Sequence, residues 1–185
     1  MSPVVIQRVL APSDALVEEA VSLLLKAMEG DPFMYVACEG NETTRAHMAR
    51  MMVREHVCWG EFWTATEDDE LVGFMTWFPP QSELAIPKDE RAKLAAPFMA
   101  ALSGDGKQYI ATVVRFFMSR LIGNHGTDRV SPQMGEEFPQ FVAQCIGTPN
   151  GKHDGWWLRI AMTRTDKQRQ GICRKLLEPV RQKVS

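Results

Sequence analysis

Apolar residues recur along the chain with two different periods, and the change of period marks the first elements. The stretch "VVIQRVL" at residues 4–10 is rich in β-branched residues and predicts a strand that ends before Pro12. Ser13 and Asp14 are suited to cap a helix that follows. The next apolar residues lie at helical spacing and predict an amphipathic helix: Leu16, Ala20, Leu24 and Met28.

A second amphipathic helix is predicted over "NETTRAHMARMMVREHV" at residues 41–57. Asn41 is its expected N-cap, and we prefer this role to glycosylation of the Asn-x-Thr match. Met48, Met52 and Val53 lie on the apolar side. Methionine fills irregular gaps in cores, so this cluster indicates core packing rather than a sulfur site.

The stretch "EFWTATEDDELVGFMTWFPP" predicts a β-hairpin. Two alternating strands flank the acidic turn, and Pro79 and Pro80 end the second strand because neither has an N–H to donate. Residues 81–150 predict a helical and irregular insert that glycines interrupt.

An apolar strand is predicted at residues 155–163, "GWWLRIAMT", followed by the turn "RTDKQRQG" and a helix at residues 172–184. Ile172, Leu176 and Leu177 are expected to face inward, and Pro179 is expected to bend this helix. The element order predicts an α+β (α/β-like) fold with a mixed sheet.

Composition and charge restrict the possible partners. The 185 residues suit one domain, and 45% hydrophobic with 24% charged residues is ordinary for a globular protein. We see no signal-peptide pattern and no apolar run of about 18 residues, so we expect no membrane partner and a cytoplasmic location, with the nucleus also open. A net charge of −2 argues against nucleic-acid binding. The charge is uneven, since residues 152–185 carry +6 and the rest −8.

Cysteine and histidine spacing predicts no metal site. The four cysteines form no CxxC pair, and the four histidines form no HxxxH or HExxH unit. We expect reduced thiols, and histidines that pack or face solvent.

The sequence "QRQGICR" places a glycine and cations at a helix start. Free backbone N–H groups and the helix dipole at such a start favour a phosphate. A plain strand–turn–helix joint, in which Gly171 serves only the backbone, is the other interpretation.

The longer stretch "GWWLRIAMTRTDKQRQGICRKLLEPV" resembles the acetyl-CoA-binding segment of the GNAT superfamily of N-acetyltransferases. In that family Q/R-x-x-G-x-G/A leads a helix, and Gln168, Gly171 and Cys173 take the three marked places. Cys173 replaces the usual Gly or Ala, Arg169 stands where Gly is frequent, and Thr165 where Pro is frequent. The segments "LVGFMTWFPP" and "EEFPQFVAQCIG" upstream look like a fungal-type branch.

This resemblance implies one acetyltransferase-like domain over residues 1–185. A GNAT-type central sheet flanked by helices would carry the insert at 81–150 and an acetyl-CoA-binding strand, turn and helix at 155–184. Later strands of the family fold are missing, so we expect a C-terminally incomplete domain. The final strand would then have a bare edge, which favours association with a partner or a homodimer.

The resemblance also implies the binding residues for acetyl-CoA. Backbone groups of Met162 and Thr163 would contact the pantetheine arm, and Gln168 belongs to the motif. Arg164 would add positive charge. The pyrophosphate would lie against the backbone N–H groups of six residues: Arg169, Gln170, Gly171, Ile172, Cys173 and Arg174. A thiol at a helix start can be reactive, but Cys173 is also simply a small residue.

The implied activity is transfer of an acyl group from acetyl-CoA to the amine of a small molecule or peptide, by direct attack. By resemblance, the helices at 16–28 and 42–57 border the acceptor groove, with residues 30–40 at its mouth. Glu61 and Glu67 are candidate bases, or solvated hairpin carboxylates. No catalytic residue is assigned, because the family's tyrosine has no counterpart after the motif. The alternative is a non-catalytic remnant that binds CoA weakly or associates through the strand edge.

Overall fold

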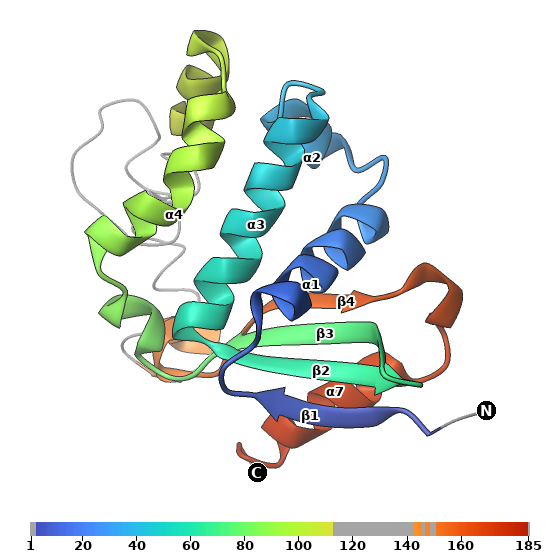
Figure 1. The fold of residues 1–185 in the computed structure, drawn as a ribbon. Helices are drawn as coiled ribbons and strands as arrows, with labels where there is room; N and C mark the ends of the chain where they lie inside the picture. Colours follow the sequence, from blue (N-terminus) through green and yellow to red (C-terminus); the bar gives the residue numbers. More distant parts are fainter. Residues whose placement is uncertain (1–2, 113–142, 146, 149–150, 185) are drawn as a thin grey trace.

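The computed structural model describes residues 3–112, 143–145, 147–148 and 151–184. Figure 1 shows an α+β fold in which a four-stranded sheet lies between helices α1 and α3 on one face and α7 on the other. The strand order is β1 (Val5–Val9), β2 (Glu61–Glu67), β3 (Glu70–Phe78) and β4 (Trp157–Thr163). Every neighbouring pair is antiparallel.

The predicted mixed sheet is therefore wrong for the described residues. A mixed sheet needs at least one pair of strands that run in the same direction. Among the described residues β4 pairs with β3, and these two strands run in opposite directions. β4 consequently has one paired edge and one edge without a described strand neighbour.

The caps that the sequence predicts are confirmed. Helix α1 (Asp14–Ala27) begins where Ser13 accepts a hydrogen bond from the Leu16 N–H at 3.2 Å. Helix α3 (Glu42–Trp59) begins where the Asn41 side chain accepts from the Thr44 N–H at 3.0 Å. Each bond satisfies one of the free N–H groups of the first helical turn.

The link between these helices contains a helix that the sequence did not predict. Helix α2 (Pro32–Ala37) has only six residues, with Asp31 as its N-cap and Pro32 at its first position. A proline suits that position because its fixed φ matches a helix and its missing N–H is not needed there.

The insert is only partly described. Its described part contains η1 (Ser82–Ala85) and α4 (Lys88–Ala101), and η2 (Gly151–Asp154) directly follows it. The predicted helical segments at 108–121 and 136–146 lie mostly outside the described residues. After β4 come η3 (Thr165–Lys167) and α7 (Ile172–Arg181), and α7 continues past Pro179 by two residues.

The hairpin turn follows a simple backbone rule. Asp68 and Asp69 connect β2 to β3 with φ values of 52° and 63°. Two residues with positive φ form the turn whose twist matches that of the flanking strands, and aspartate tolerates this conformation.

Each face of the sheet has its own core. Leu24 of α1, Val53 of α3 and Phe62 and Phe74 of the sheet pack together on one face. On the other face α7 packs against the sheet through apolar residues that are buried or half-buried: Ile172, Leu176, Leu177, Ala65, Val72 and Met75.

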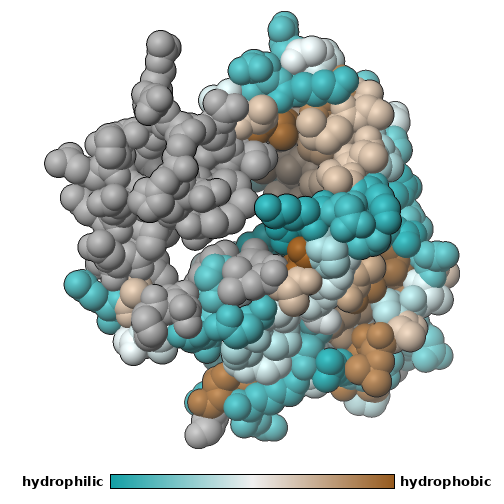
Figure 2. Space-filling model, turned by 90° about the vertical axis from the view of Figure 1, so that its left-hand side faces the viewer, coloured by the Kyte–Doolittle hydropathy of each residue, from teal (hydrophilic) through white to brown (hydrophobic). Residues whose placement is uncertain are grey.

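None of the described helices is long and apolar enough to cross a membrane. On the face in Figure 2 the most hydrophobic coloured residues lie apart from one another among hydrophilic ones.

Candidate functional site between β4 and α7

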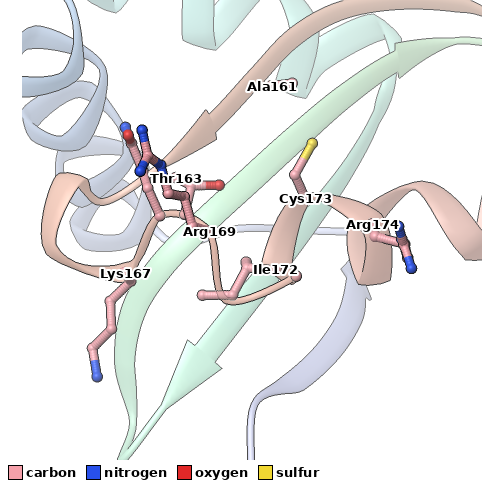
Figure 3. Close-up of a pocket in the computed structure, with 9 residues that line it drawn as sticks. Ala161, Thr163, Lys167, Arg169, Ile172, Cys173 and Arg174 are labelled. Atoms are coloured by element: carbon pink, nitrogen blue, oxygen red, sulfur yellow. The ribbon is translucent and has the colours of Figure 1, made fainter.

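An open groove lies between the end of β4 and the start of α7 (Figure 3). Its volume is about 470 Å³. Two strand residues, the turn and the first turn of α7 line it: Ala161, Thr163, Lys167, Gln168, Arg169, Gly171, Ile172, Cys173 and Arg174. The groove thus joins a sheet edge to a helix N-terminus.

The strand contributes backbone groups to the groove. The Arg164 N–H donates to the Val72 carbonyl at 2.9 Å, which makes these two residues a hydrogen-bonded pair of the antiparallel ladder. Such pairs alternate along the strand. The backbone groups of Met162 therefore face β3, whereas those of Ala161 and Thr163 face the open edge.

The turn brings the chain into the left-handed region twice. Arg169 has a φ of 62° and Gly171 a φ of 79°. Glycine accepts this conformation without strain, whereas an L side chain at Arg169 costs about 1–2 kcal/mol. The backbone therefore explains why glycine would suit position 169.

Helix α7 starts without a side-chain cap. Gly171 is its N-cap residue and has no side chain to offer. The first intrahelical bond at this end joins the Lys175 N–H to the Gly171 carbonyl at 3.0 Å. The N–H groups of Ile172, Cys173 and Arg174 precede that bond, so they have no partner within the helix. Three donors and the positive end of the helix dipole thus face one region.

Two arginines add positive charge that no ion pair neutralises within the described residues. Arg169 and Arg174 both line the groove and form no such pair there. Figure 3 shows Arg169 reaching up beside Thr163, whereas Arg174 points away from the strand end. Arg169 is thus the better placed of the two to meet an anion at the end of β4.

The other cations near the groove are paired. Lys167 lines the groove but forms an ion pair with Glu67, and it points away from Thr163 in Figure 3. Arg164 pairs with Glu70 and Asp166, each at 2.8 Å. Hydrogen bonding to Arg164 lowers the pKa of Asp166. The expectation that Arg164 contributes charge to the groove is therefore not met, because its guanidinium is held by two carboxylates.

Seven of the nine predicted binding residues line this groove, and two do not. Met162 faces β3 through its backbone, as the ladder register requires. Gln170 folds back, and its Nε2 donates to the Asp166 carbonyl at 3.3 Å. Ala161 and Lys167 line the groove but were not predicted. The strand register would have identified Ala161, but that register is visible only in the folded sheet.

Cys173 lies at the groove surface. Its side chain is exposed, and Figure 3 shows the sulfur directed into the space toward β4. Cys58 and Cys145 are exposed elsewhere, and Cys38 is buried. Cys173 is therefore a reporter group inside the groove, with two accessible thiols outside it for comparison.

The two candidate bases are held in ion pairs. Glu67 is 8% exposed and bonds Lys167, and Glu61 is 5% exposed and bonds Lys183 and Arg8. Neither is a solvated carboxylate. Neither lines the groove, so a role as general base at the groove has no geometric support.

A second pocket, of about 340 Å³, lies at α2 and the start of α3. It is lined by residues of the segment expected at the mouth of an acceptor groove, among them Tyr35 and Cys38, and by Arg45 of α3. Burial raises the pKa of the Cys38 thiol, whose sulfur lies 3.6 Å from that of Met48. The thiol therefore stays protonated as a small apolar group.

A buried histidine lies at the end of α3. His56 is 4% exposed, and its Nδ1 is 3.1 Å from the Thr76 hydroxyl. Its ring packs edge-on against Phe78, with centroids 5.4 Å apart. Burial, with the charges of Arg159 and Arg91, lowers the pKa of His56 to about 3, so the ring is neutral.

The described residues contain no group of three or more His, Cys, Asp or Glu side chains that would hold a metal ion. No protein-family model matches the chain, and the comparison with curated proteins found no significant match. The groove is therefore the feature from which we infer a function.

Proposed function

We propose that this chain is an acyl-CoA-dependent N-acyltransferase of the GNAT kind, which binds acetyl-CoA in the groove between β4 and α7. One observation carries the proposal: the strand end at Ala161 and Thr163, whose backbone groups have no strand partner among the described residues, meets an uncapped helix N-terminus across an open groove. An extended amide-containing arm that ends in a pyrophosphate fits these two kinds of donor.

Each part of acetyl-CoA would have its own partners in the groove. The edge backbone of Ala161 and Thr163 would pair with the amides of the pantetheine arm as a further strand does. The N–H groups at the start of α7 would bind the pyrophosphate oxygens. Arg169 would add charge attraction at the end of β4, weakened by salt because this side chain is exposed.

The chemistry needs little from the protein beyond position. The amine nitrogen of the acceptor forms a bond to the thioester carbonyl carbon, the C–S bond breaks, and the sulfur leaves with the bonding electrons. The nitrogen loses one proton and the departing thiolate gains one. A backbone N–H near the end of β4 would polarise the carbonyl. The acceptor is the amine of a small molecule or peptide.

Thiol footprinting tests the binding step without requiring activity. The protein is treated briefly with iodoacetamide, with and without millimolar acetyl-CoA, and alkylation of each cysteine is followed by peptide mass spectrometry. We expect acetyl-CoA to slow alkylation of Cys173 several-fold. Cys58 and Cys145 are the internal controls, because both are exposed and lie outside the groove.

A matched pair of glycine variants links protection to the turn. Gly171 and Gly147 have φ values of 79° and 76°, and a Cβ on either would meet no atom within 4 Å. Alanine therefore introduces similar strain at both, but only Gly171 lines the groove. Gly171→Ala should reduce the acetyl-CoA-induced rise in thermal midpoint, and Gly147→Ala should preserve it. Unchanged Cys173 alkylation together with no thermal shift in the wild-type protein would overturn the proposal.

A second candidate function is association through β4. The outward backbone groups of Ala161 and Thr163 in this strand have no strand partner among the described residues, and such an edge can pair with another chain. Light scattering after size-exclusion chromatography, together with an acetylation assay, distinguishes this function from acyl transfer. A monomer that acetylates amines would exclude this alternative, whereas a dimer that dissociates when proline replaces Ala161 would favour it.

A further inference from the structure

A buried carboxylate on the α7 face of the sheet binds cations from two distant segments. Glu61 is the first residue of β2 and is 5% exposed. Lys183 Nζ lies 2.7 Å from its Oε1 and 2.6 Å from its Oε2. Arg8 of β1 lies 3.0 Å from Oε1, and the indole N–H of Trp63 donates to Oε2 at 3.0 Å.

Aromatic rings enclose the same ammonium group. Lys183 Nζ lies 5.4 Å from the ring centroid of Trp63 and 4.8 Å from that of Trp156. A cation within about 6 Å of an indole face is attracted by the ring, and tryptophan is the best ring for this purpose. We call Glu61, Trp63 and Trp156 the indole cage.

The cage and its occupant differ in how firmly they are held. Glu61 and Trp63 belong to β2, which has a strand on each side, and Trp156 directly precedes β4. Lys183 instead follows the end of α7, and its side chain is 35% exposed while that of Glu61 is 6% exposed. The occupant can therefore leave while the cage stays in place.

The cage also favours a second cation beside Arg8. If Lys183 left, Oε2 of Glu61 would keep only the bond from Trp63, because Arg8 pairs with Oε1. A buried carboxylate oxygen with too few donors is unfavourable. An organic ammonium ion supplies the positive charge that attracts this carboxylate and the two indole faces together.

We propose that the indole cage is a binding site for a small organic ammonium ion, which Lys183 occupies when no ligand is present. Lys183 is thus an internal competitor that the ligand must displace. The proposal does not depend on acetyl-CoA binding, because the cage and the groove lie at opposite ends of α7. That helix has ten residues and is about 15 Å long.

The test removes the competitor and supplies an external cation. Choline is titrated into the wild-type protein and the Lys183→Ala variant, and the five tryptophan indole N–H signals are followed by ¹H–¹⁵N NMR. Lys175→Ala is the matched control, since Lys175 is an exposed lysine of α7 outside the cage. The uncharged isostere 3,3-dimethylbutan-1-ol is titrated in parallel.

We expect choline to shift two of the five indole signals in Lys183→Ala, with at least about tenfold tighter binding than in the wild-type protein. Lys175→Ala should behave as the wild type, and the isostere should bind at least about tenfold more weakly than choline. Adding Glu61→Gln to Lys183→Ala should reduce the preference for the cation to what the two indole faces supply. Absence of choline-dependent shifts in folded Lys183→Ala, or equal shifts from the isostere, would overturn the proposal and leave Lys183 as a structural clamp.

Discussion

The buried imidazole of His56 makes the stability of this protein depend on pH in a predictable direction. Its pKa is lowered from 6.5 to about 3, mainly by burial. Below pH 6.5 the unfolded chain binds a proton at this residue, while the folded protein does not until the pH approaches 3. The stabilising effect is therefore complete above pH 6.5 and is lost progressively as the pH falls from 6.5 toward 3.

The size of this effect follows from the two pKa values. At pH 5 the pH lies about 1.5 units below the pKa of the unfolded imidazole and still well above that of the folded one. Protonation then stabilises the unfolded form alone, by about 2 kcal/mol. This loss is a large fraction of the 5–15 kcal/mol that typically separates folded and unfolded states. Only 4% of His56 is exposed, so a charge on its ring would be poorly hydrated.

The assay compares urea unfolding of the wild type and His56→Gln at several pH values between 5 and 8. Glutamine cannot titrate but retains hydrogen-bonding capacity toward Thr76. We expect the variant to be less stable at pH 8, and the wild type to lose about 2 kcal/mol more than the variant on going to pH 5. NMR of the imidazole provides an independent measurement. Parallel pH profiles, or an imidazole that titrates near 6.5 in the folded protein, would refute the reasoning.

Four other substitutions have expected outcomes that urea unfolding measures. Arg169→Gly should stabilise the protein by about 1 kcal/mol by relieving the positive φ, while it weakens acetyl-CoA binding; a destabilised variant would contradict the backbone argument. Gly171→Ala should cost about 1 kcal/mol for the same reason, and no cost would show that the turn relaxes. Asn41→Ala should cost about 1 kcal/mol through the lost cap of α3, whereas Asn41→Ser should cost less. Leu24→Ala should cost about 2–5 kcal/mol because this side chain is fully buried, and a value under 1 kcal/mol would contradict the described core.

Local patterns predicted the elements whose causes are local. Ser13 and Asn41 cap their helices through residues three positions away, so the sequence contains the whole interaction. The hairpin is local in the same sense, since two strands and their turn are consecutive. Helix α2 escaped prediction because six residues show too little periodicity to be recognised.

Features that join distant segments were not predictable from the sequence. The backbone N–H and C=O groups of Ala161, and not those of Met162, face the open edge of β4. Which residues do so depends on the register between β3 and β4. The bond from Lys183 to Glu61 spans 122 positions, and neither residue carries a local signal of it. The motif at Gln168–Arg174 predicted most groove residues because turn and helix start are adjacent in the chain.

The pairing of β3 with β4 also affects the order of events during synthesis. β3 ends at Phe78, whereas its neighbour begins at Trp157, about 80 residues later. At about 5–20 residues per second, a ribosome needs roughly 4–16 s to make that interval. The nascent hairpin thus exposes the unpaired edge of the apolar strand β3 for seconds, and a chaperone that binds strand edges would have time to engage it before β4 pairs with it.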